Sequence, residues 1–147
     1  MNKHAIIIGI HGVLLSEEER EYLATYKPLG VILFKRNILN KKQVIDLIKS
    51  IKIILGKQTF ILIDQEGGKV NRLDTAIWPT FPSARTFGKL AEKDLNKAKI
   101  ETFNNYNSIG KHLSQLGINV NCAPVLDLLH NNTSSVIGSR AFSSNPH

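Results

Sequence analysis

The stretch from Asp64 to Arg72 holds the densest group of residues whose side chains could do chemistry. It reads Asp-Gln-Glu-Gly-Gly-Lys-Val-Asn-Arg and directly follows an apolar run. Its two glycines permit a sharp backbone turn that returns the arginine toward the aspartate. A carboxylate can accept hydrogen bonds from two adjacent sugar hydroxyls, and a guanidinium offers a planar fork of donors. The stretch therefore predicts a site for a hydroxyl-rich ligand, unless Asp64 and Arg72 merely pair with each other or with Lys69.

Asp64 and Glu66 also raise the question of a catalytic carboxylate pair. Residues two apart in a strand face the same side, and retaining glycosidases hold their two carboxyl groups about 5 Å apart. Glu66 comes where the strand is expected to end, however, and Gly67 and Gly68 beyond it offer backbone N–H groups. We therefore expect Glu66 to organise the loop rather than to act in catalysis.

Apolar runs alternate with helical patterns along the chain. Continuous apolar runs predict parallel strands, covered on both faces, over residues 5–10, 30–34, 59–63 and 118–123. Capping residues and apolar residues at helical spacing predict helices over 16–26, 40–55 and 94–117. A long irregular stretch, expected to be functional or a lid, separates the third strand from the last helix. This order predicts an α/β fold with a parallel sheet and right-handed crossovers.

The alternation alone is compatible with both a doubly wound sheet and a barrel. The first expected strand is not followed by Gly-x-Gly-x-x-Gly, and Gly56-Lys57 lacks the spacing of a phosphate-binding loop. Barrels place their functional groups at the carboxyl ends of the strands. Arg36-Asn37, Asp64 and Asp127 follow expected strands, and Arg140 could reach the same mouth.

Composition bounds the class of protein. The 147 residues are 42% hydrophobic and 21% charged, which is typical of one globular domain spanning 1–147. The formal net charge is +7, but the lysines are spread over expected helix faces, so we predict no nucleic-acid partner. No apolar run reaches the roughly 18 residues of a membrane helix, so no membrane association is predicted. Cys122 is the only cysteine; we expect it to be partly buried and structural, and the lack of an internal disulfide favours the cytoplasm.

Four motifs, found in the same order, resemble the N-terminal barrel domain of glycoside hydrolase family 3. The closest likeness is to bacterial β-N-acetylhexosaminidases that recycle the cell wall. The motifs are residues 30–37, 63–72, 116–127 and 137–146. The resemblance implies that Asp64, Arg72 and Arg140 bind an N-acetylglucosamine-containing saccharide. It also implies a retaining hydrolysis that uses neither a metal nor another cofactor.

The resemblance further implies that catalysis needs residues outside this chain. A complete barrel takes about 250 residues, so these 147 would supply roughly the first four strands of an incomplete (β/α)8 TIM barrel. In the family, a sugar-binding Lys-His pair, the acid/base histidine and the nucleophilic aspartate all come later in the sequence. We therefore expect the catalytic residues beyond His147 and none within the chain. His112 and His130, like His147, do not lie in a matching context.

An isolated chain of this kind is expected to lack hydrolytic activity, because positioning groups cannot replace a missing nucleophile. Its first and fourth strands would be open edges with apolar faces, which invite pairing with another chain. Three interpretations remain open. The chain is the remnant of a truncated gene, one half of a split enzyme that docks with a second chain completing the barrel, or a stand-alone carbohydrate-binding or scaffold module.

Overall fold

The computed structural model describes residues 3–73 and 76–146. Within these residues, one parallel sheet has the strand order β1-β2-β3-β4. The strands are β1 (His4–Gly9), β2 (Pro28–Leu33), β3 (Phe60–Ile63) and β4 (Val120–Asn121). The helices are α1 (Glu17–Tyr26), α2 (Lys41–Leu55), α3 (Ala84–Ala91) and α4 (Leu95–Leu116), with short 3-10 helices η1 (Lys35–Asn37) and η2 (Gly138–Arg140). None of the described helices is long and apolar enough to cross a membrane.

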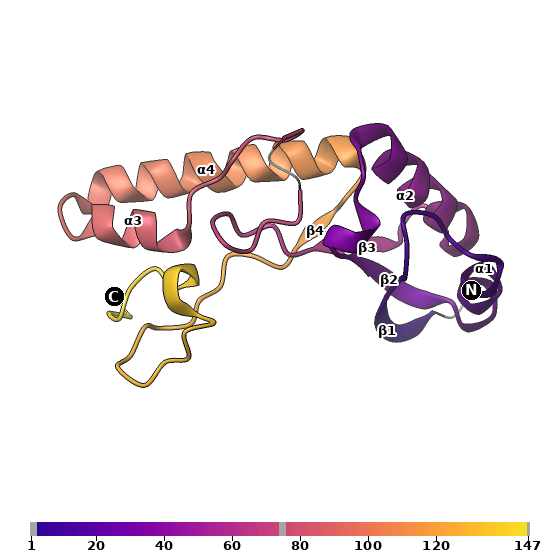
Figure 1. Cartoon of the computed structure of the whole chain (residues 1–147), viewed down its shortest axis with the longest axis horizontal. Helices are drawn as coiled ribbons and strands as arrows, with labels where there is room; N and C mark the ends of the chain where they lie inside the picture. Colours follow the sequence, from indigo (N-terminus) through magenta and orange to yellow (C-terminus); the bar gives the residue numbers. More distant parts are fainter. Residues whose placement is uncertain (1–2, 74–75, 147) are drawn as a thin grey trace.

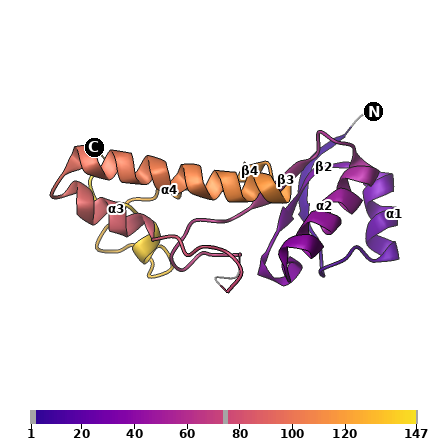
Figure 2. The same cartoon turned by 90° about the horizontal axis from the view of Figure 1, so that it is seen from above.

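The molecule is elongated, with its sheet at one end. The helices α1 and α2 contact each other beside the sheet. The long helix α4 runs back from α3 to the start of β4, and the C-terminal segment lies near α3 (Figures 1 and 2). The alternation of parallel strands and helices confirms the α/β class.

Local sequence signals set the starts of the helices. The Ser16 side chain accepts a hydrogen bond from the Glu19 N–H at 3.1 Å, and the Glu19 carboxylate accepts one from the Ser16 N–H at 2.9 Å. This reciprocal capping box starts α1 as the sequence predicts. The side chains of Asn40 and Asp94 cap α2 and α4 with one hydrogen bond each.

The hydrophobic core lies between β2, β3 and the helices α2 and α4. The strand side chains without exposed surface are Val31, Leu33, Ile61 and Ile63. They belong to one cluster with the helical side chains Val44, Leu47, Ile48, Ile51, Ile109, Leu113 and Leu116. The ladder pairs Leu33 with Ile63, and Ile63 with Asn121. The residues that follow β2, β3 and β4 therefore lie together at the carboxyl ends of the strands.

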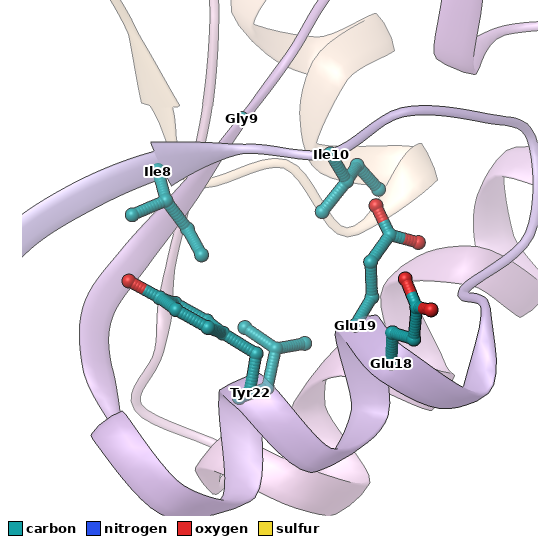
Figure 3. Close-up of a pocket in the computed structure, with 7 residues that line it drawn as sticks. Ile8, Gly9, Ile10, Glu18, Glu19 and Tyr22 are labelled. Atoms are coloured by element: carbon teal, nitrogen blue, oxygen red, sulfur yellow. The ribbon is translucent and has the colours of Figure 1, made fainter.

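β1 differs from the expectation of a strand covered on both faces. Ile6 is 46% exposed and Ile7 is 36% exposed. A hollow of about 360 Å³ lies between β1 and α1, lined by Ile8, Ile10 and Tyr22 among others (Figure 3). Among the described strands β1 pairs with β2 only, so its other edge is open. The prediction of a buried first strand is wrong because an apolar sequence alone does not supply the neighbour that would bury it.

Two elements in the second half of the chain also differ from the sequence expectation. The strand expected over 118–123 is reduced to the two residues of β4. Helix α3 lies in the stretch that was expected to be irregular. This helix has only eight residues and contains Gly88, which lowers intrinsic helix propensity, so its formation depends on packing against α4 and η2.

Gly88 allows a test of the packing between α3 and the C-terminal segment. A Cβ atom at Gly88 would lie 1.7 Å from the carbonyl oxygen of Phe142. We expect Gly88→Ala to lower the free energy of unfolding by about 1–3 kcal/mol, because one backbone segment must move. Gly110→Ala in α4 is the matched control: open space surrounds that position, so alanine should raise the free energy by about 0.5–1 kcal/mol. Denaturant unfolding measures both, and equal stability of the two variants would contradict this packing.

Candidate functional site

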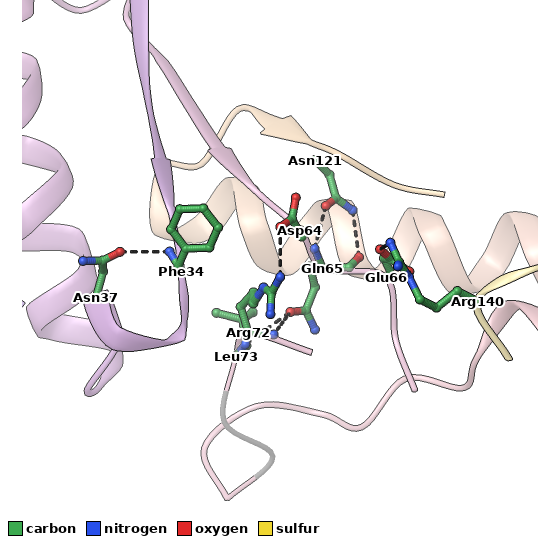
Figure 4. A network of polar contacts seen from close by, with 9 residues as sticks. All are labelled: Phe34, Asn37, Asp64, Gln65, Glu66, Arg72, Leu73, Asn121 and Arg140. Atoms are coloured by element: carbon green, nitrogen blue, oxygen red, sulfur yellow. Dashed lines mark hydrogen bonds and ion pairs between the residues drawn. The ribbon is translucent and has the colours of Figure 1, made fainter. Parts of the chain in front are cut away.

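Three consecutive residues at the carboxyl end of β3 organise the candidate site. They are Asp64, Gln65 and Glu66. The side chains of Asp64 and Gln65 both bind the segment at Arg72, and the side chain of Glu66 binds Arg140 (Figure 4). Asp64 is partly exposed, whereas Gln65 and Glu66 are buried. The strand therefore ends in one accessible carboxylate, one buried amide and one buried carboxylate.

Asp64 binds Arg72, as one interpretation of the sequence expected. Arg72 Nη2 donates to Asp64 Oδ2 at 3.0 Å, and both side chains remain partly exposed. The guanidinium carbon of Arg72 also lies 5.9 Å from the centroid of the Phe34 ring. The buried Arg72 Nε has no hydrogen-bond partner among the described residues. The pair thus uses one carboxylate oxygen and one guanidinium nitrogen, which is compatible with further hydrogen bonds to a ligand.

Two glycines make the turn between these partners. Gly67 has φ 89° and Gly68 has φ 61°, both in the left-handed region that disfavours other residues. A Cβ atom at Gly67 would also lie 2.3 Å from the carbonyl oxygen of Pro82. The Gly68 N–H donates to the Phe81 carbonyl at 2.9 Å, which fixes the turn against the following loop. The Gly-Gly sequence is therefore required for the return of Arg72 to Asp64.

Glu66 binds Arg140, which lies 74 residues further along the chain. Arg140 Nε donates to Oε2 at 2.9 Å and Nη2 donates to Oε1 at 2.8 Å, a bidentate geometry. The Glu66 side chain is nearly inaccessible. The hydrogen bond to Glu66 is the main cause that raises the pKa of Arg140, and the Glu66 charge adds to the burial that raises the pKa of Tyr106. Glu66 thus organises a loop, although its partner is η2 rather than the adjacent glycines.

This geometry does not favour a catalytic pair formed by Asp64 and Glu66. Each carboxylate is bonded to its own arginine, and the Glu66 side chain is almost fully covered. Neither is therefore placed to donate a proton to a leaving group. Among the described residues no group of three His, Cys, Asp or Glu side chains could hold a metal ion.

The other polar residues expected at strand ends have different surroundings. Asn37 is fully buried and donates to the carbonyls of Ile10 and Gly12 at 3.1 and 2.8 Å. The Arg36 guanidinium stacks 4.7 Å from the Phe34 ring centroid and donates to the Ile10 carbonyl at 3.0 Å. Both side chains therefore fix the chain after β1. The exposed Asp127 does not join the Asp64–Arg72 pair.

Cys122 follows β4, and it is exposed rather than partly buried as expected. Burial raises the pKa of its thiol, and the charge and hydrogen bonding of the neighbouring Asp64 carboxylate raise it further. The burial expected from cysteine's usual preference is wrong here because β4 is the last described strand of the sheet and ends one residue earlier.

Sequence reasoning missed the two amides that join β3 to β4 and to the loop. Asn121 and Gln65 are both bonded across this boundary (Figure 4). The available signal was the pair Asn119 and Asn121, because two asparagines two residues apart in an otherwise apolar strand occupy one side of it.

The thiol of Cys122 gives a pH-dependent test of the site. Neighbouring atoms raise the pKa of the thiol first by partial desolvation and then through the charge and hydrogen bond of Asp64. A raised pKa leaves less thiolate at a given pH, so alkylation by iodoacetamide should follow a midpoint above the ordinary 9.0. Asp64→Asn should lower this midpoint and speed alkylation at mildly alkaline pH, whereas Asp127→Asn should leave both unchanged. An unaltered midpoint in Asp64→Asn would show that the carboxylate does not face the thiol.

Comparison with curated proteins gives relatives of the whole chain. A β-hexosaminidase of Xylella fastidiosa is 31% identical over 142 residues, covering 97% of this chain and 42% of the relative. A β-hexosaminidase of Xanthomonas campestris pv. campestris is 33% identical over 141 residues, covering 96% of this chain and 42% of the relative. The chain thus spans about 42% of the length of these relatives.

Solved structures give the same relationship. NagZ from Neisseria gonorrhoeae in complex with N-trifluoroacetyl-D-glucosamine matches with a TM-score of 0.91 and 31% identity, over 98% of this chain and 42% of that one. A family 3 β-N-acetylglucosaminidase from Paenibacillus sp. str. FPU-7 matches with a TM-score of 0.79 and 31% identity, over 95% of this chain and 26% of that one. The match to NagZ confirms the fold prediction of the first four strands of an incomplete (β/α)8 barrel.

The family model of the glycosyl hydrolase family 3 N-terminal domain matches residues 6–147, which include every residue of the Asp64–Arg72 and Glu66–Arg140 pairs. The four motifs that suggested this resemblance lie within the matched range. The chain belongs to glycosyl hydrolase family 3, as part of its N-terminal domain.

Proposed function

We propose that this chain carries the substrate-positioning part of a β-N-acetylhexosaminidase site and binds an N-acetylglucosamine-containing saccharide. The observation that carries the proposal is the 3.0 Å pair of Asp64 and Arg72 at the carboxyl end of β3. Active sites of barrel enzymes lie at this end of the strands. The relatives support this class of ligand, because they include β-hexosaminidases and a NagZ complex with an N-acylated glucosamine.

The proposed ligand contacts follow from donor and acceptor types. The partly exposed Asp64 carboxylate would accept hydrogen bonds from neighbouring ring hydroxyls, and the remaining Arg72 donors would bind ring or acyl oxygens. Arg140 would add a third contact while Glu66 holds its guanidinium. A neutral saccharide is well matched, because both arginines already have a carboxylate partner.

We propose that the chain alone does not hydrolyse glycosides. Asp64 and Glu66 each accept hydrogen bonds from an arginine, so neither carboxylate is placed to act as a nucleophile or as an acid/base group. In the complete family, a retaining double displacement would require an aspartate nucleophile and an acid/base histidine. We expect both to lie outside these 147 residues, in the portion that the relatives have in addition.

The exposed apolar surfaces support the proposal that a second polypeptide completes the barrel. Ile6 and Ile7 are exposed on β1, whose outer edge has no partner among the described strands. At the other end, a hollow between α3, α4 and the C-terminal segment is lined by Phe103, which is 70% exposed, and Leu126, which is 80% exposed. Exposed apolar groups of this kind mark contact surfaces. They favour the split-enzyme interpretation over a stand-alone module.

The proposed activity also suggests a cellular role. We assign the chain to the cytoplasm and to recycling of cell-wall saccharides. A single cysteine that is not tied into a disulfide fits a reducing compartment. N-acetylglucosamine-containing cell-wall fragments would be the substrates of the completed site.

Isothermal titration of the purified chain with N-acetyl-D-glucosamine tests the binding proposal. We expect saturable binding that weakens about tenfold or more in Asp64→Ala, a loss of about 1.4 kcal/mol or more. Asp46→Ala is the matched control, because Asp46 also pairs with a cation, Lys42, but lies on the exposed face of α2. The absence of saturable binding, or equal weakening in both variants, would refute the assignment.

A chromogenic N-acetyl-β-D-glucosaminide tests the absence of catalysis in the same preparation. We expect no hydrolysis above the rate measured in buffer without protein, because the chain supplies only positioning groups. Turnover that disappears in Asp64→Ala or Glu66→Ala would instead make these carboxylates the catalytic pair.

A further inference from the structure

We propose that Gln65 is a positioning residue that sets Arg72 against Asp64, with Asn71 and Asn121 orienting it. The inference rests on the proposed saccharide site and assigns a role to the one residue between its two carboxylates. Gln65 is 0% exposed, so it contacts no ligand itself and would act only through its neighbours.

The side chain of Gln65 ties the returning loop to the end of β3. Its Oε1 accepts hydrogen bonds from the backbone N–H groups of Arg72 at 3.0 Å and Leu73 at 3.2 Å. Its Nε2 donates to Asn71 Oδ1, and Asn71 Nδ2 donates to the Leu73 carbonyl at 2.9 Å. One buried amide therefore makes the hydrogen bonds that hold the backbone at Arg72.

The backbone of Gln65 is itself fixed by Asn121 of β4. Asn121 Oδ1 accepts from the Gln65 N–H at 3.0 Å, and Asn121 Nδ2 donates to the Gln65 carbonyl at 3.0 Å (Figure 4). A side-chain amide has the same donor and acceptor as a peptide group. Asn121 thus extends the sheet by one further pairing step, beyond the point where β3 and β4 stop.

Asn119, the residue before β4, also bonds to the β3 segment through its side-chain amide, but to two residues instead of one. Its Oδ1 accepts from the Ile61 N–H at 2.7 Å, and its Nδ2 donates to the Thr59 carbonyl at 3.1 Å. The two asparagines therefore hold β3 at both ends of a two-residue ladder. Only Asn121 pairs with the residue that holds Arg72, so the two positions provide a matched comparison.

Arg72 depends on this amide more than Arg140 does. The Arg72 side chain is joined to Asp64 by one hydrogen bond, and a Gly-Gly turn separates the two residues. Arg140 is held by two hydrogen bonds from Glu66, and its backbone N–H donates to the Ile137 carbonyl at 2.8 Å. The two arginines are positioned by separate contacts, so loss of Gln65 should affect only Arg72.

A double-mutant cycle tests whether Gln65 acts through Arg72. In titrations with N-acetyl-D-glucosamine, we expect Gln65→Met to weaken binding about tenfold. In an Arg72→Met background Gln65→Met should add almost nothing, whereas in an Arg140→Met background the tenfold loss should persist. Gln65→Glu should recover only part of the affinity, because a carboxylate oxygen can accept the same two N–H bonds but a carboxylate cannot donate to Asn71. Equal losses in all three backgrounds would assign Gln65 a general structural role and overturn the proposal.

Amide hydrogen exchange provides a readout that needs no ligand. In Gln65→Met the N–H groups of Arg72 and Leu73 should exchange at least tenfold faster, with the Arg140 N–H unchanged. If Gln65→Met does not fold, Asn71→Ala should give the same pattern with a smaller change. The exchange rate of the Arg72 N–H should also rise more in Asn121→Ala than in Asn119→Ala. Unchanged exchange at Arg72 would refute the positioning role. Faster exchange together with no saccharide binding by the wild-type chain would refute the proposed function alone.

Discussion

Regular sheet pairing stops at the carboxyl end of β3, and hydrogen bonds of the next three residues hold the chain there. Asp64 binds the Arg72 loop, Gln65 binds the same loop and β4, and Glu66 binds η2. The contacts of Asp64 and Glu66 join segments that the backbone ladder does not connect, and the contact of Gln65 with Asn121 continues the ladder between β3 and β4. The accessible part of the site, the Asp64–Arg72 pair, depends on the buried Gln65, whereas the buried Glu66 holds Arg140.

Burial decides which of these residues faces a ligand and which holds the frame. Buried polar groups are tolerated when their hydrogen-bonding capacity is satisfied, and the amide of Gln65 and the carboxylate of Glu66 both meet that condition. Asp64 has the more open surroundings, with the Cys122 thiol and the Arg72 guanidinium as neighbours. The site therefore combines a buried, hydrogen-bonded support with one accessible ion pair, Asp64 and Arg72. This arrangement suits ligand binding better than bond cleavage.

The sequence predicts those features of the fold and the site that depend on residues close together in the chain. The Asp64–Arg72 pair spans a short Gly-Gly turn, and the start of α1 is set by Ser16 and Glu19, so local patterns suffice for both. Burial and long-range pairing require the whole fold. The exposure of Ile6, the formation of α3 and the choice of Arg140 as the partner of Glu66 depend on chain segments far away in sequence.

Gln65 illustrates the limit most clearly. A glutamine between two acidic residues has the composition of an exposed loop, and only the path of residues 71–73 turns it into a buried amide. Asn121 gave a partial signal, because it interrupts an apolar strand, but its partner could not be inferred before the register of β3 and β4 was known. Cys122 was misplaced for the same reason, since its exposure depends on where β4 ends.

The central claim is that the chain grips a saccharide with the guanidinium groups beside Asp64 and Glu66. The side-chain Nε–H resonances of its arginines, followed by nitrogen-15 NMR during titration with N-acetyl-D-glucosamine, test it most directly. We expect the Arg72 and Arg140 signals to shift together along one saturation curve, while the signal of Arg85, which pairs with Glu92, stays fixed. Saturable shifts confined to other arginines, or none at any arginine, would contradict the account.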